Sequence, residues 1–256
     1  MPPDAALLDY LLRLADNDLV LAQRLGEWVG KGPVLEEDIA STNVGLDLIG
    51  QARLWYAYAG EVEARIKGTG RDEDAFAFRR DAHEFRNLLL VEQPNGIYAD
   101  TIARQFLFDA WHLLHLRALA RSTDARIAEI AAKAAKEASY HAERSADWVV
   151  RLGDGTELSH RRMQAAIDDL WMYTGEMFEP EAGEQALAAD GIAADVAALQ
   201  APWNEAVGAV LAEATLKRPS DGWMQKGGKA GRHTEHLGHL LAEMQFLQRA
   251  YPGARW

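Results

Sequence analysis

Apolar side chains recur every three or four residues along most of the chain, which is the spacing of one face of an α-helix. Over residues 98–121 this face is interrupted by Asp109, and over residues 125–152 it is interrupted by Glu137 and His141. A carboxylate within a core face is costly unless it meets a proton, a cation, a hydrogen-bond network or a metal. The two consecutive helices therefore predict a shared polar site inside a helical bundle.

The same spacing predicts helices elsewhere in the chain, and no segment alternates with the period of a strand. Turns that contain glycine or proline separate these helices. A short helix and a turn between the second and third long helices would form a crossover of the kind found in some four-helix bundles. We expect helices over residues 5–29, 36–67, 72–89, 98–121, 125–152, 159–178, 197–216 and 234–250.

No linker is long or polar enough to divide the chain, so we expect a single all-α domain over residues 1–256. Four long helices would form its bundle, and the additional C-terminal helices would pack outside it. Each long helix carries one acid on its apolar face: Asp18, Asp47, Asp109 and Glu137. One such acid is as often solvated or salt-bridged at the edge of a stripe as buried, but one in each of four helices favours a common polar core.

Di-iron bundles take a Glu from each of two helices and a Glu-x-x-His motif from each of the other two. Three positions after Asp47 and Glu137, this chain has Gly50 and Tyr140. His141 lies one position later, about 100° further around the helix. We therefore interpret the four acids and His141 as a degenerate, metal-free version of a dimetal site, with no metal ligand, cofactor-binding residue or catalytic residue. The alternative is a chain that binds two metals through these same residues and oxidises a substrate or stores iron.

Residues 227–238 combine a glycine-rich loop with basic and histidine side chains. The most prominent are Lys229, Arg232, His233 and His236. The loop lacks the spacing and the preceding strand of a phosphate-binding loop, and Thr234 interrupts any His-Glu-x-x-His zinc motif. None of these side chains extends a core stripe. We predict that they contact another subunit, because glycine lets a loop approach a partner closely.

Composition narrows the classes of function. The 256 residues carry a formal net charge of −12, which argues against binding to nucleic acid or to an anionic membrane surface. The absence of cysteine excludes disulfides, thiolate metal sites and a cysteine nucleophile. The first residues lack the pattern of a signal peptide, and no apolar run reaches the roughly 20 residues of a membrane span. We expect a cytoplasmic protein.

Several longer motifs are more specific than any single residue. They include Val-Glu-Gln-Pro-Asn-Gly at 91–96, Asp-Ala-Trp-His at 109–112 and Gly-Gly-Lys at 227–229. Others cover residues 43–53, 99–105, 151–156, 233–238 and 241–245. Together these motifs resemble the non-catalytic structural subunits of bacterial ring-1,2-phenylacetyl-CoA epoxidases, and the resemblance extends over nearly the whole chain.

The resemblance implies a ferritin-like bundle that pairs with a related catalytic subunit, which holds the di-iron centre and the CoA thioester. Such a complex adds one oxygen atom of O₂ across the aromatic ring in aerobic phenylacetate breakdown, with electrons from a separate reductase. This chain would be its scaffold and would bind no iron, in agreement with Gly50 and Tyr140. Its expected partners are the catalytic subunit and the other subunits of the complex. A homodimer, or a homodimeric scaffold outside this pathway, is the remaining alternative.

Overall fold

The computed structural model describes residues 3–254 and contains α-helices and short 3₁₀ helices, with no strand in that range. The all-α expectation is therefore confirmed. The described chain forms two compact units: unit 1 contains residues 3–93 and 227–254, and unit 2 contains residues 94–226. The expectation of one domain stays a prediction. None of the helices in the described range is both long and apolar enough to cross a bilayer.

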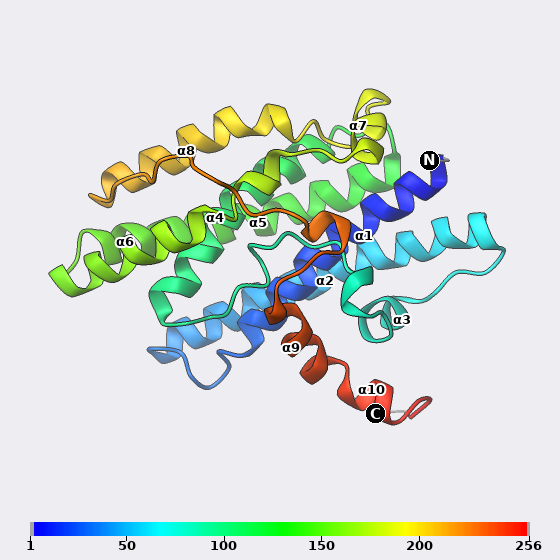
Figure 1. The fold of residues 1–256 in the computed structure, drawn as a ribbon, viewed down its shortest axis with the longest axis horizontal. Coiled ribbons are helices and arrows are strands. Elements are labelled where there is room, and N and C mark those ends of the chain that lie inside the picture. Colours follow the sequence, from blue (N-terminus) through cyan, green and yellow to red (C-terminus); the bar gives the residue numbers. More distant parts are fainter. Residues whose placement is uncertain (1–2, 255–256) are drawn as a thin grey trace. The chain divides into compact units, whose positions relative to one another are not determined.

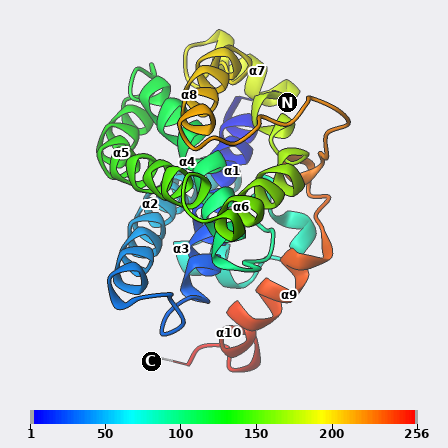
Figure 2. The ribbon, with the colours of Figure 1, turned by 90° about the vertical axis from the view of Figure 1, so that its left-hand side faces the viewer.

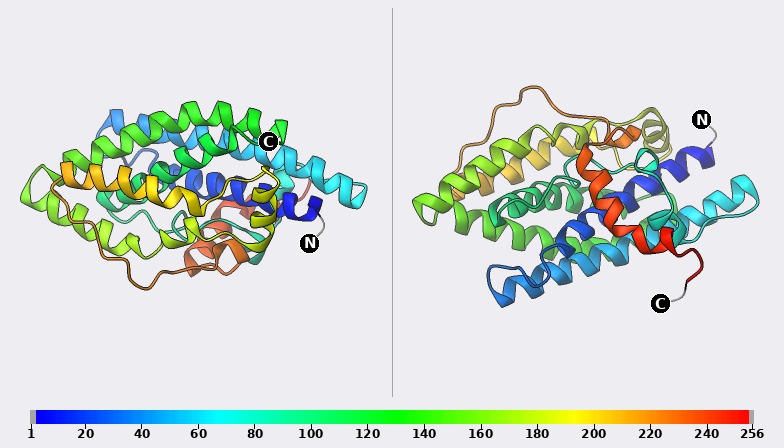
Figure 3. Two further views of the ribbon diagram at one scale, coloured as in Figure 1. Left: turned by 90° about the horizontal axis from the view of Figure 1, so that it is seen from above. Right: turned by 60° about the horizontal axis from the view of Figure 1, so that its bottom comes forward.

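Unit 1 is built on two long antiparallel helices, α1 (Pro3–Gly26) and α2 (Leu35–Lys67), which lie side by side (Figures 1 and 2). Helix α1 is buried on nearly every side, and α2 is capped by Gly68, whose left-handed conformation favours glycine. The shorter elements are α3 (Glu73–Phe78), η1 (Ala82–Glu84), η4 (Gly228–Ala230), α9 (Glu235–Met244) and α10 (Phe246–Ala250). Helices α9 and α10 follow one another at the C-terminal end, drawn in red (Figure 3).

Residues 79–89, which the sequence predicts to be helical, are mostly irregular. The backbone N–H of Arg86 donates to Asp16 Oδ2 at 2.8 Å, and that of Leu88 donates to Asn17 Oδ1 at 2.8 Å. Side chains of α1 thus satisfy donors that a helix would pair with its own carbonyls. The expected helix is wrong beyond α3 because these tertiary hydrogen bonds replace local ones.

Unit 2 is built on α4 (Tyr98–Leu119) and α5 (Ala125–Gly153), which pack against each other and closely match the expected helices. The Asp124 side chain caps the first turn of α5 by accepting from two backbone N–H groups. The other elements are α6 (Glu157–Trp171), η2 (Gly175–Phe178), α7 (Ala182–Ala189), η3 (Ala197–Leu199) and α8 (Gln200–Glu213). Trp203 on α8 is buried, and its indole donates to the Leu107 carbonyl of α4 at 3.1 Å.

Candidate functional site

Helices α4 and α5 bring a buried polar cluster together in unit 2. Asp109 is 1% exposed, and its Oδ1 accepts a hydrogen bond from Gln105 Nε2 at 2.8 Å. Burial raises the pKa of Asp109 to about 6, although His141, Ser145 and Gln105, with a smaller effect from Arg144, act to lower it. Asp109 and His141 are therefore two members of the predicted polar core that interact electrostatically within unit 2. The carboxyl can hold or release a proton near neutral pH.

Two further histidines of α4 belong to this cluster. The rings of His112 and His115 are buried and pack on Phe108 and Trp111, with ring centroids 4.9 Å apart for Phe108–His112 and 4.5 Å apart for Trp111–His115. Burial lowers the pKa of His112 well below its ordinary value, and the neighbouring histidines lower it further. His112 is therefore neutral. Its place in the cluster was not predicted, although the three-residue steps from Asp109 to His112 to His115 put these side chains on one face of the helix.

The other predicted members of the acid cluster differ in exposure. Asp18 of α1 is 1% exposed, whereas Asp47 of α2 is half-buried, and both belong to unit 1. Glu137 of α5 is half-buried and precedes His141 by four residues, about one turn of the helix. The expectation that acids from all four long helices converge stays a prediction, since it joins residues of both units.

The two positions that a di-iron bundle would fill with histidine do not fit that role. Gly50 has no side-chain donor atom, and Tyr140 is 53% exposed. A metal centre of this class depends on imidazole nitrogen at both positions. Among residues 3–254, no three or more His, Asp or Glu side chains are grouped as a metal ion would require.

A second buried network, in unit 1, is centred on Glu92. Its Oε1 accepts from the backbone N–H and the hydroxyl of Thr234 at 2.6 and 2.8 Å. Its Oε2 accepts from Asn87 Nδ2 at 2.9 Å and lies 2.8 Å from Nδ1 of His233. The backbone carbonyl of Glu92 accepts from the guanidinium of Arg24 at 2.7 and 3.1 Å. The fully buried carboxylate thus holds the C-terminal segment against the irregular segment before α4.

The ring of His233 has oxygen acceptors on both sides. Nε2 lies 3.0 Å from the carbonyl oxygen of Phe85, and Nδ1 faces the carboxylate of Glu92. Because a carbonyl oxygen and an ionised carboxylate only accept, both ring nitrogens are placed to donate, which favours the cationic ring. Burial alone would lower the pKa of His233, but the hydrogen bond and charge of Glu92, with the Phe85 carbonyl, raise it above its ordinary value.

Two of the four residues singled out in the segment 227–238 have buried side chains within unit 1. Lys229 is 6% exposed, and the side chain of His233 is 4% exposed. The ring of His233 is buried where it meets Glu92 and the carbonyl of Phe85 inside unit 1. Arg232 is exposed and His236 is half-buried. Contact of these side chains with another subunit stays a prediction.

A buried ion pair between Arg80 and Asp16 was not predicted from the sequence. The guanidinium of Arg80, 1% exposed, donates to both carboxylate oxygens of Asp16 and, at 2.9 Å, to the hydroxyl of Tyr56. Burial, and then the charge of Asp16, raise the pKa of Tyr56 well above its ordinary value, so its hydroxyl keeps its proton and donates to Asp16. The run Asp16-Asn17-Asp18, polar on successive faces of an apolar helix, was the available signal.

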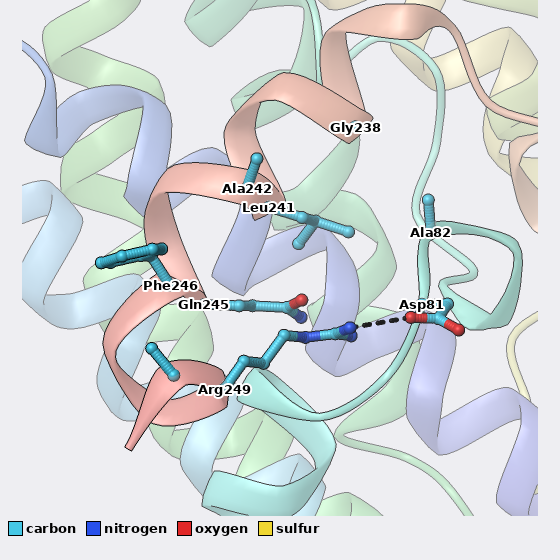
Figure 4. Close-up of a pocket in the computed structure, with 9 residues that line it drawn as sticks. Asp81, Ala82, Gly238, Leu241, Ala242, Gln245, Phe246 and Arg249 are labelled. Atoms are coloured by element: carbon cyan, nitrogen blue, oxygen red, sulfur yellow. Dashed lines mark hydrogen bonds and ion pairs between the residues drawn. The ribbon is translucent and has the colours of Figure 1, made fainter. Parts of the chain in front are cut away.

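A hollow of about 510 Å³ lies in unit 1 between η1 and the helices α9 and α10 (Figure 4). Leu241 and Phe246 contribute apolar lining. Arg249 pairs with Asp81 at 2.9 Å, and Gln245 donates to two backbone carbonyls. These polar side chains are engaged within the chain, so the hollow offers mainly apolar surface and no evident chemistry.

Comparison with known proteins agrees with the motifs found in the sequence. The model of the family described as phenylacetic acid catabolic protein matches residues 2–256. The chain is also 53% identical to one of the subunits of the 1,2-phenylacetyl-CoA epoxidase of Escherichia coli (strain K12) over 250 residues, which cover 98% of this chain and 99% of the relative. The family match covers nearly the whole chain, and the alignment with the relative covers nearly the whole of both proteins. The chain belongs to the phenylacetic acid catabolic protein family.

Proposed function

We propose that this chain is a structural subunit of a phenylacetyl-CoA epoxidase, which pairs with and stabilises a di-iron catalytic subunit during aerobic phenylacetate catabolism. The observation that carries the proposal is the 53% identity to a subunit of the Escherichia coli epoxidase, which extends over 98% of this chain. An identity this high over full length supports a common role in the complex, and a subunit by its nature works with partners.

The residues at the would-be metal positions support a non-catalytic role. Gly50 and Tyr140 cannot supply the imidazole nitrogens of the two histidines. We propose that the di-iron centre and the bound CoA thioester belong to the partner and that this chain contributes no catalytic residue.

The fold that best serves this role is a ferritin-like bundle formed by α1, α2, α4 and α5, located in the cytoplasm with the other enzymes that act on CoA thioesters. Two of these helices pair within unit 1 and two within unit 2. Rigid helices of this length can cover and brace a similar bundle, and a permanent interface of this type usually buries about 2,000 Å² or more. Other subunits of the complex, including a reductase, would join the pair.

Co-expression with the catalytic subunit tests the proposal. A tag on this chain should retain the untagged catalytic subunit through purification, and the pair should epoxidise phenylacetyl-CoA when a reductase supplies electrons. This chain alone should show no turnover under the same conditions. Turnover by this chain alone, or failure to retain the catalytic subunit at any salt concentration, would contradict the proposal.

A further inference from the structure

Helix α2 carries an apolar stripe on its outer side. Leu35, Ile39, Leu46 and Ile49 are 71%, 53%, 59% and 40% exposed, and Val34 before them is 52% exposed. At 100° per residue, the four helical positions fall within an arc of about 80°. The opposite face of α2, which includes Leu48, Ala52 and Trp55, is buried. The stripe is therefore a second apolar face, additional to the one that packs inside unit 1.

The stripe matches in size the largest apolar patches of monomeric proteins, which are often functional. Its four helical residues expose on the order of 400 Å² of apolar side chain, which is within the range of the largest patches on monomers. That is about half of the roughly 800 Å² that each partner contributes to a standard interface. The stripe ends at the exposed Arg53, and Gly50 beside it has no atom within 4 Å of where a Cβ would lie. A helix could therefore approach α2 closely at Gly50.

Charge indicates what kind of partner fits. Glu36 is exposed and Asp47 half-buried, and both project from one flank of the stripe, about 100–120° from Leu35 by helical geometry. The whole chain carries a net charge of −12, so a second copy would bring like charge to the same flank. A helix with an apolar face and Lys or Arg along its edge complements both the apolar and the charged part of this surface.

We infer that the Leu35–Ile39–Leu46–Ile49 stripe of α2 is the docking surface for an apolar, basic-edged helix of the catalytic subunit. The inference rests on the proposed function, because that function supplies the partner. It adds the face by which the two subunits meet.

The test compares two glutamate substitutions on the same helix. Leu46→Glu places a charge in the stripe, whereas Ile66→Glu places it at 43% exposure on the far side of α2 and serves as the matched control. Leu46→Glu should raise the Kd for the catalytic subunit at least tenfold, and Ile66→Glu should change it less than twofold. Both isolated variants should keep the wild-type melting temperature within a few degrees, because both positions are exposed.

A crosslinking measurement keeps the test valid if Leu46→Glu fails to fold. The chain has no cysteine, so Asn43→Cys, exposed beside the stripe, is a unique attachment site for a photoreactive maleimide. It should crosslink to the catalytic subunit, and Ile66→Cys should not. Wild-type binding by Leu46→Glu, equal loss in both glutamate variants, or a crosslink only to a second copy of this chain would overturn the inference. No binding by the unsubstituted chain would overturn the proposed function itself.

Discussion

The cationic ring of His233 gives unit 1 a pH-dependent contribution to stability. Its pKa is raised above the ordinary value mainly by Glu92, against the effect of burial. A raised folded-state pKa means that the stabilisation is fully present below the unfolded value of about 6.5 and is lost as pH rises through the folded pKa. His233→Gln should therefore lower the free energy of unfolding most at pH 6, by on the order of 2 kcal/mol, and progressively less in alkaline solution.

Thermal unfolding of the wild type and His233→Gln between pH 5.5 and 9 checks this. The difference in melting temperature should shrink as pH rises. His239→Gln, at an exposed position of α9, is the control and should leave the pH profile unchanged. A difference that is constant across the range would show that folding does not shift the pKa of His233, which would contradict the account.

Asp109 also makes stability depend on pH, but here burial is the cause of the raised pKa. Burial raises its pKa to about 6, so the folded state binds the proton more tightly than the unfolded state does. Its contribution to stability is therefore present below about pH 4 and is lost as pH rises through 6. Asp109→Asn should remove this dependence and be tolerated, because an amide can still pair with Gln105 without carrying charge.

Asp109→Ala should cost on the order of 2–4 kcal/mol, because it leaves a cavity and unpaired polar neighbours. Denaturant unfolding at pH 5 and pH 7.5 separates the two variants. Equal and negligible effects of both substitutions at both pH values would mean that the carboxyl is not part of a buried polar cluster.

The short 3₁₀ helix η4 is held to the irregular segment before α4 by close backbone packing. A Cβ on Gly228 would lie 2.2 Å from the carbonyl oxygen of Asn87 and 3.1 Å from the backbone nitrogen of Leu89. Gly228→Ala should therefore destabilise unit 1 by about 1–3 kcal/mol, as overpacking of a fixed backbone does. The matched control is Gly208→Ala in the middle of α8, where no atom lies within 4 Å of the added Cβ.

The control substitution Gly208→Ala should stabilise α8 by about 0.5–1 kcal/mol, because alanine loses less entropy than glycine on helix formation. Urea titrations of the two variants measure both effects. If Gly228→Ala is as stable as Gly208→Ala, the segment is not packed against Asn87 as the structure has it.

These elements also show how far the sequence alone could predict the fold. The helices α4 and α5 were predictable because their apolar faces repeat regularly and Asp124 marks a start. Residues 79–89 were not, because their hydrogen bonds go to side chains of α1 that are about 70 residues away in the chain. A still longer separation hid the Glu92–His233 pair, whose residues are 141 positions apart.

For the entire molecule, the sequence predicts the class and the family better than the site. The all-α class and the membership of the phenylacetic acid catabolic protein family agree with the structure and the comparisons. In the polar core, Asp109 and His141 were found, and His112 and the Arg80–Asp16 pair were missed. The partners of a buried polar group come from other helices. The spacing of residues along the sequence predicts which face of a helix is buried, but it does not predict which partner covers that face.

The iron content of the purified chain tests the central claim, that this subunit supports a di-iron centre without holding it. After iron-replete expression, elemental analysis should find less than about a tenth of an iron per chain when it is purified alone, because two imidazole ligands are missing. The complex with the catalytic subunit should contain about two irons per pair, as one carboxylate-bridged centre requires. Two tightly bound irons in the isolated chain would contradict the account.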